Sequence, residues 1–117
     1  MSQLPTIAHL IDGQSAQGAN PNPRSQEVFN PATGKAEKRV LLADKATVEQ
    51  AIASAQAAFP AWRNTPPLKR ARVMGNLKVL LEQHAQEICA MITAEHGKVL
   101  SDAFGEVQRG IENVEYA

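Results

Sequence analysis

Cys89 is the only cysteine of the chain and therefore its only candidate thiol nucleophile. A reactive thiolate needs a neighbouring base or cation that lowers the thiol pKa. Cys89 instead falls between Ile88 and Ile92 on the apolar face of an expected helix, and His84, five residues earlier, lies off that face. A buried free cysteine behaves as a small hydrophobic side chain. We therefore predict that Cys89 packs in a core and is not catalytic.

Two histidines stand next to carboxylates at spacings that could begin a metal site. His84 precedes Glu87 by three residues, which places both on one helical face, and Glu95 is followed directly by His96. A zinc site needs three or four ligands, and the further ligands are missing here. Both histidines fall at expected helix ends, where capping or solvation explains a polar side chain. We predict no metal site, and we expect the third histidine, His9, to be a partly exposed strand residue.

The two Gly-Lys pairs of the chain do not complete a phosphate-binding loop. Such a loop reads Gly-x-x-x-x-Gly-Lys-Ser/Thr, because backbone amides hold the phosphates and the hydroxyl binds magnesium. Gly97-Lys98 has Ile92 in place of the first glycine and Val99 in place of the hydroxyl, and Gly34-Lys35 fails at both positions as well. The Gly-x-Gly-x-x-Gly fingerprint of dinucleotide sites is also absent. The sequence thus predicts no cofactor-binding residue in this segment.

Glycines and charged residues recur near the end of the chain at helical spacing. We expect Gly105 and Gly110 to let helices approach closely, because glycine has no side chain. Three carboxylates and an arginine alternate in the same stretch, which is typical of a solvated face. They are Glu106, Arg109, Glu112 and Glu115. By chemistry alone, residues 1–117 therefore contain no predicted catalytic, cofactor-binding or metal-binding residue.

The elements that precede these residues begin with strands, expected over about residues 7–42. A short apolar run over 7–12 ends at Gly13 and predicts a strand followed by a tight turn. Residues 18–23 are rich in Pro, Asn and Gly and predict an exposed loop against which nothing packs. Residues 27–29 and 38–43 flank the turn sequence Asn-Pro-Ala-Thr-Gly at 30–34, which predicts a hairpin.

Four amphipathic helices are expected over about residues 45–117. Asp44 is a natural N-cap for the first helix, and Pro60 is expected to end it. Pro66-Pro67 opens the second helix, since proline is tolerated in a first turn. Gly97 ends the third in a left-handed conformation, and Ser101 is expected to cap the fourth.

The fourth helix carries an apolar stripe that needs a partner surface. Its members are Phe104, Val107, Ile111 and Val114. The pattern runs into Tyr116-Ala117 without a capping residue or a polar tail, so we expect the chain to be cut from a longer one.

Composition excludes several functional classes. The chain has 117 residues, 12 basic against 12 acidic, and 44% hydrophobic residues, which is typical of one ordinary soluble domain. With no excess of basic residues, nucleic-acid binding has no electrostatic support. No apolar stretch is long enough to span a membrane. One cysteine cannot form an internal disulfide, so a reducing compartment, the cytoplasm, is expected.

Several motifs resemble the aldehyde dehydrogenases, and within them the CoA-acylating methylmalonate-semialdehyde dehydrogenases. The general marks of the family are Asn-Pro-Ala-Thr-Gly at 30–34 and Glu-x-Gly-Lys at 95–98. The subfamily is indicated by the histidine within Glu-His-Gly-Lys, by Thr-Pro-Pro at 65–67 and by Gly-Ile-Glu-x-Val-Glu at 110–115. Further matching stretches lie at 10–13, 57–62 and 70–72. The resemblance therefore covers nearly the whole chain.

The resemblance implies a fold and a function for a longer protein. The fold is the α/β aldehyde dehydrogenase fold, of which residues 1–117 would be the N-terminal part of the cofactor-binding domain, mainly helical with a short N-terminal hairpin and edge strands. The catalytic domain, the nucleophilic cysteine, the base and the cofactor loop would lie downstream. The longer enzyme would bind NAD, oxidise methylmalonate or malonate semialdehyde, pass the acyl group to coenzyme A and release CO2. It would be a homo-oligomer, with no nucleic-acid or membrane partner, and the isolated segment would be inactive.

One alternative stays open on the residues alone. A complete small helical interaction module, which self-associates or binds a partner through the apolar stripe of the fourth helix, would also lack an active site.

Overall fold

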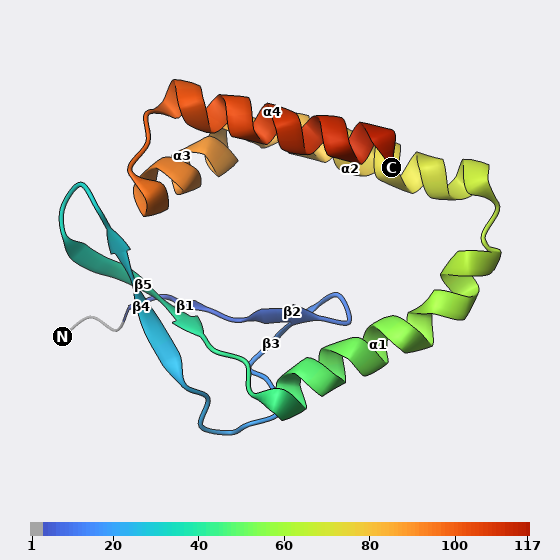
Figure 1. The fold of residues 1–117 in the computed structure, drawn as a ribbon, viewed down its shortest axis with the longest axis horizontal. Coiled ribbons are helices and arrows are strands. Elements are labelled where there is room, and N and C mark those ends of the chain that lie inside the picture. Colours follow the sequence, from blue (N-terminus) through green and yellow to red (C-terminus); the bar gives the residue numbers. More distant parts are fainter. Residues whose placement is uncertain (1–3) are drawn as a thin grey trace. The chain divides into compact units, whose positions relative to one another are not determined.

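The computed structural model describes residues 4–117, which form five short strands and four helices (Figure 1). The strands are β1 (Thr6–Ile7), β2 (His9–Ile11), β3 (Gln14–Ala16), β4 (Ser25–Asn30) and β5 (Lys35–Leu41). The helices are α1 (Lys45–Asn64), α2 (Pro67–Gln83), α3 (Ala85–His96) and α4 (Leu100–Tyr116). These elements divide into two compact units. The first holds residues 4–29 and 34–64, and the second holds residues 30–33 and 65–117.

β4 and β5 form the hairpin that the turn sequence predicts. The amide of Ala32 donates to Oδ1 of Asn30 at 3.0 Å, and the amide of Thr33 donates to the carbonyl of Asn30 at 3.2 Å. Gly34 closes the turn at a φ of 68°, a left-handed conformation that glycine adopts without strain. β1 adds to the free side of β5 in parallel, so the strand order is β1-β5-β4.

β2 and β3 form a second, tighter hairpin that the sequence predicts only in part. Asp12 and Gly13 make the turn, both with positive φ, and Leu10 pairs with Ser15 across it. The expected single strand over 7–12 is wrong, because the chain pairs Ile7 with β5 and then leaves that sheet to form β2. β3 has only three residues and no apolar alternation, so its sequence carries no strand signal.

α1 begins where the sequence predicts and continues past the predicted end. Asp44 caps it by accepting a hydrogen bond from the amide of Thr47 at 2.8 Å. The expected stop at Pro60 is wrong, because Pro60 lies inside the helix, which ends at Asn64. A proline inside a helix removes its own hydrogen bond to the fourth residue before it and leaves the later bonds available.

The other three helices largely follow their sequence signals. Pro67 occupies the first position of α2, and Gly97 ends α3 in a left-handed conformation with a φ of 86°. The expected cap at Ser101 is wrong, since Ser101 is the second residue of α4. Val99 precedes the helix instead, and its carbonyl accepts the amides of Asp102 and Ala103, so α4 begins without a side-chain cap.

The core of the second unit lies between α3 and α4 and consists of small and branched side chains. Its buried members are Ala85, Cys89, Ala103, Val107 and Ile111, with Leu81, Ile88 and Ile92 packed against them. The expected stripe of α4 is therefore corrected. Val107 and Ile111 already have their partner inside the chain, whereas Phe104 is 53% exposed and does not belong to the buried core.

The two glycines of α4 do not mark a close helix contact. A Cβ placed on Gly110 would meet no atom within 4 Å, and one on Gly105 would meet only the Arg109 side chain at 3.9 Å. The expectation that both let helices approach closely is wrong, because the buried face of α4 runs through Ala103, Val107 and Ile111. In residues 4–117, no helix is both long enough and apolar enough to cross a membrane.

Candidate functional site

Cys89 lies in the core of the second unit with 4% of its surface exposed, as predicted. A cavity of about 290 Å³ borders it, lined also by Gln86, Ala90, Leu100 and Phe104. None of these lining side chains is a base or a cation that could generate a thiolate. The surroundings of Cys89 therefore favour packing and offer no means of activation.

The histidines occupy the positions that the sequence predicts for them. His84 joins α2 to α3, and its Nδ1 lies 3.2 Å from Oε1 of Glu87. His96 is the last residue of α3. Over the described part of the chain, no group of three or more His, Cys, Asp or Glu side chains is placed to hold a metal ion. The observed pair of His84 and Glu87 is an exposed contact at a helix junction.

Two carboxylates of the expected solvated face of α4 are exposed but paired. Glu106 pairs with Lys98, whose hydrogen bond lowers the pKa of the Glu106 carboxyl. Glu115 accepts a hydrogen bond from Lys78 of α2 at 2.7 Å, and this bond raises the pKa of the Lys78 amine. These pairs tie α4 to the α3–α4 connection and to α2, so their charges serve contacts within the second unit.

The Gly97-Lys98 pair also has a structural use. The amide of Gly97 donates to the carbonyl of Thr93 at 2.8 Å, and the amine of Lys98 is engaged by Glu106. A phosphate would need both of these donors. Both donors are therefore already bonded within the second unit.

The first unit contains a polar cluster that the sequence reasoning missed. Thr47, 3% exposed, donates its hydroxyl to Oδ1 of Asp44 at 2.7 Å and accepts the amide of Ala19 at 3.0 Å. A Cβ on Gly18 would lie 2.7 Å from that hydroxyl oxygen. The expectation that nothing packs against the 18–23 loop is wrong, because this loop is held against the start of α1. The spacing Asp-x-x-Thr at 44–47 is the signal that could have located the cap, but the sequence separation of 28 residues hides the contact with Ala19.

The pKa of the Asp44 carboxyl is held below its ordinary value of 3.8. The hydrogen bond from the Thr47 hydroxyl is the main cause, and the bond from the Thr47 amide is the next. Asp44 is therefore an ionised cap, and its charge favours the positive end of the α1 dipole.

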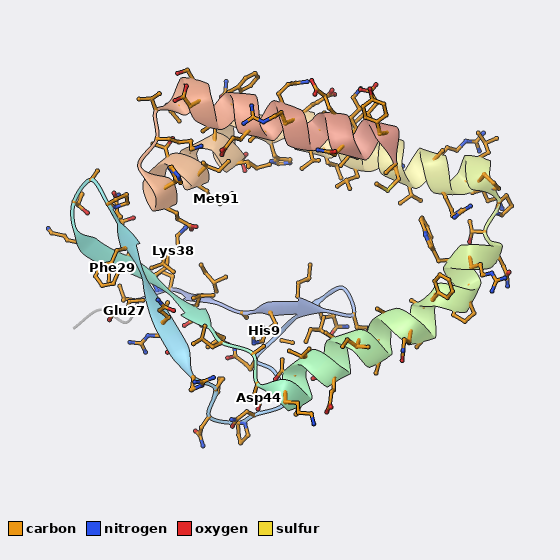
Figure 2. All side chains as sticks on the ribbon, viewed as in Figure 1. His9, Glu27, Phe29, Lys38, Asp44 and Met91 are labelled. Carbon is orange, nitrogen blue, oxygen red and sulfur yellow. The ribbon has the colours of Figure 1, made fainter. Side chains whose placement is uncertain are left out.

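An open groove of about 450 Å³ lies beside this cluster, between β2 and α1. His9 and Asp44 are labelled in Figure 2, on the strand and at the start of the helix respectively. The lining residues are His9, Leu10, Ile11, Ala43, Thr47, Val48, Ala51, Ile52 and Ala55. His9 is half-buried in β2, as expected, and is the only titratable side chain among these lining residues. An apolar groove with a single imidazole can hold apolar groups, and its one hydroxyl, that of Thr47, is already bonded to Asp44 and to the amide of Ala19.

A sequence model of the aldehyde dehydrogenase family matches residues 19–117. The chain belongs to the aldehyde dehydrogenase family. The match spans the hairpin turn at 30–34, all four helices and the Glu-His-Gly-Lys stretch, so the motifs that carry the resemblance lie inside it. The resemblance to the aldehyde dehydrogenase family inferred from those motifs is confirmed.

Relatives of this aldehyde dehydrogenase chain include malonate-semialdehyde dehydrogenases. The enzyme of that name from Pseudomonas aeruginosa is 56% identical over 112 residues, which cover 96% of this chain and 22% of the relative. Malonate-semialdehyde dehydrogenase 3 of Geobacillus kaustophilus is 40% identical over all of this chain and 24% of its own length. The chain thus spans about a quarter of the length of these relatives.

Solved structures show the same fold. A Sinorhizobium meliloti protein assigned as a methylmalonate-semialdehyde dehydrogenase, crystallised with NAD, superposes with a TM-score of 0.92 at 39% identity, over 99% of this chain and 23% of that one. Lactaldehyde dehydrogenase from Escherichia coli gives a TM-score of 0.88 at 27% identity, over 97% of this chain and 24% of that one. The expected fold class, a mainly helical segment of the α/β aldehyde dehydrogenase fold with short N-terminal strands, is confirmed.

Proposed function

We propose that residues 1–117 are the N-terminal part of the cofactor-binding domain of a CoA-acylating semialdehyde dehydrogenase. The observation that carries this proposal is the 56% identity with a malonate-semialdehyde dehydrogenase over nearly the whole chain. The short coverage of that relative, 22%, supports reading this chain as one segment of a longer enzyme.

The longer enzyme would convert malonate or methylmalonate semialdehyde, coenzyme A and NAD into acetyl-CoA or propionyl-CoA, CO2 and NADH. Names of relatives support the semialdehyde substrates, and one solved relative with NAD supports the cofactor. The acyl group would pass through a thioester on an enzyme cysteine before coenzyme A receives it. That cysteine lies outside this segment, because Cys89 is buried in a hydrophobic core.

The described residues do not themselves fit NAD. They lack the glycine fingerprint, and the amide of Gly97 and the amine of Lys98 already have partners. The role proposed for this segment is therefore to cover and support the cofactor-binding fold, and it contributes no catalytic residue, cofactor ligand or metal ligand. A cytoplasmic location and a homo-oligomeric enzyme complete the proposal, the former because the single cysteine suits a reducing compartment.

The test uses the product of the complete open reading frame that contains this chain. We expect the purified protein to form NADH from malonate semialdehyde or methylmalonate semialdehyde, with acetyl-CoA or propionyl-CoA appearing in equal amount when coenzyme A is present. An aldehyde without a carboxylate, such as propionaldehyde, is the control substrate and should react more slowly. The 117-residue chain, assayed in parallel, should form no NADH.

Two results would contradict the proposal. Oxidation of the semialdehydes to free acids, with no dependence on coenzyme A, would be consistent with an aldehyde dehydrogenase but would contradict the proposed CoA-acylating activity. A reading frame that stops after Ala117 would favour the alternative, a complete helical interaction module without enzymatic activity.

A further inference from the structure

Gly97 is constrained by a direct contact as well as by its backbone conformation. It has a φ of 86°, and a Cβ at this position would lie 2.8 Å from Cγ and 3.6 Å from Cβ of Pro31. The first of these distances is too short for non-bonded carbon atoms. Gly13 and Gly34 also have positive φ, but a Cβ on either would meet nothing within 4 Å. The ring of Pro31 therefore lies directly on the space that a side chain at residue 97 would fill.

The segment that presents this ring is a turn closed by its own hydrogen bonds. Asn30 accepts the amide of Ala32 through its side chain and the amide of Thr33 through its carbonyl, and the Thr33 hydroxyl adds a longer bond of 3.5 Å to that carbonyl. Proline also fixes its own φ. Hydrogen bonds within residues 30–33 thus hold the ring in one orientation.

The surface that receives the ring is fixed as well. On one side of Gly97, its amide bonds the carbonyl of Thr93 at the end of α3. On the other side, Lys98 pairs with Glu106, and the Lys98 side chain is only 16% exposed. The carbonyl of Val99 then accepts the first amides of α4. The connection between α3 and α4 is therefore held at both ends around the glycine.

We propose that residues 30–33 form a strap, by which we mean a turn that packs through Pro31 on the Glu-His-Gly-Lys stretch at 95–98. The Asn-Pro-Ala-Thr-Gly and Glu-His-Gly-Lys motifs thus meet in one packing contact, in which the Pro31 ring lies against Gly97. The contact belongs to the second unit, which contains both segments. It is independent of the proposed dehydrogenase function.

The test is a double-mutant cycle on the product of the complete open reading frame that contains this chain, with the unfolding midpoint as the readout. Gly97→Ala should lower the unfolding midpoint by several degrees, because it adds both backbone strain and a clash with Pro31. Pro31→Ala should lower the midpoint in the native background but raise it in the Gly97→Ala background, since it removes the clashing ring. Gly13→Ala is the control, with similar backbone strain and no neighbour, and its effect should add to that of Pro31→Ala. Additive effects of Pro31→Ala and Gly97→Ala would overturn the proposal.

A second measurement covers the case in which Gly97→Ala does not fold. In the unmodified chain, proton NMR should show a nuclear Overhauser contact between the Pro31 ring protons and the α protons of Gly97. Assigned resonances without that contact would also overturn the strap.

Discussion

At the scale of single residues, the structure makes Cys89 a packing residue, and thiol chemistry can test this. Cys89 is 4% exposed, so a thiol reagent should modify the native chain slowly and the denatured chain fast. Cys89→Ala should cost about 1 kcal/mol of stability, because it removes one buried sulfur and leaves a small cavity. The measurement is the rate of labelling with and without denaturant, which needs no correction because the chain has one cysteine. Fast labelling under native conditions would contradict the buried position.

The ionisation of Asp44 makes the stability of the folded chain depend on pH, and its contribution can be measured separately. Its pKa is lowered in the folded chain, so its ionised form stabilises the fold above the ordinary value of 3.8, and this contribution is lost as the pH falls through the lowered pKa. Asp44→Asn keeps a capping oxygen but cannot titrate. We expect the unfolding midpoints of the two proteins to differ near neutral pH and to converge in acid.

Subtracting the midpoint-against-pH curve of Asp44→Asn from that of the native chain also removes the effect of other titrating side chains. The pKa of Glu106 is lowered too, but Glu106 is present in both proteins, so its effect cancels in the difference. Ser101→Ala is a second control, because Ser101 sits inside α4 and caps nothing, and it should leave the midpoint almost unchanged. Curves that stay parallel down to strong acid would show that the Asp44 charge is not coupled to folding.

At the scale of the elements, the face that α4 buries can be tested by two truncations. Ile111 is 3% exposed in the core, so Ile111→Ala should cost about 2–5 kcal/mol. Phe104 is a larger residue on the same helix but is 53% exposed, and Phe104→Ala should cost far less. Denaturant unfolding of the two variants measures both costs. Equal costs, or a larger cost for Phe104→Ala, would show that Phe104 is buried on the same face of α4 as Ile111, as the sequence predicts.

The elements that the sequence predicts well are those whose signals are local. Asn30 and Gly34 determine the hairpin turn from within five residues, and Gly97 ends α3 through its own backbone conformation. Pro60 and Ser101 mislead for the same reason, since a local stop or cap signal is overridden when neighbouring turns are already helical. Helix periodicity identified the buried positions 89, 107 and 111 but could not tell which further apolar residues have a partner.

The candidate sites also differ in whether their sequence signals are local. The sequence alone predicted the buried, packed position of Cys89, because that position follows from apolar residues within one or two helical turns. The cluster of Asp44, Thr47 and Ala19 was missed, because one of its bonds joins residues 28 positions apart. The contact between Pro31 and Gly97 was missed for the same reason, although both motifs had been recognised separately.

At the scale of the whole molecule, the chain should bind NAD no better than background. Residues 4–117, which the structure describes, contain no glycine fingerprint, and the amide of Gly97 and the amine of Lys98 are already bonded to Thr93 and Glu106. Titration calorimetry of NAD into the 117-residue chain is the measurement, and the full-length enzyme is the positive control. Micromolar binding by the short chain would show that a cofactor site is complete within it.

The chain should also bind a dye for exposed apolar surface. Leu10 is 79% exposed, and Val48, Ile52, Phe59 and Trp62 of α1 are all exposed. Leu10, Val48 and Ile52 line one groove. Because a large exposed apolar patch is unusual on a stable monomer, we expect dye fluorescence and a broad, weakly cooperative melt from a helical chain. Lengthening the chain through the downstream dinucleotide fold should reduce dye binding and sharpen the melt. A steep two-state transition of the monomer without dye binding would favour a self-contained module.

The division into two units gives each of them a natural reporter. The only tryptophan, Trp62, lies in the first unit, and the only cysteine, Cys89, lies in the second. Indole fluorescence therefore follows the opening of one unit while the accessibility of the thiol follows the other, in one unaltered polypeptide. If the two signals change at the same denaturant concentration, the units unfold as a single cooperative system, and if they change at different concentrations, the interval between them measures how independently each unit holds its structure.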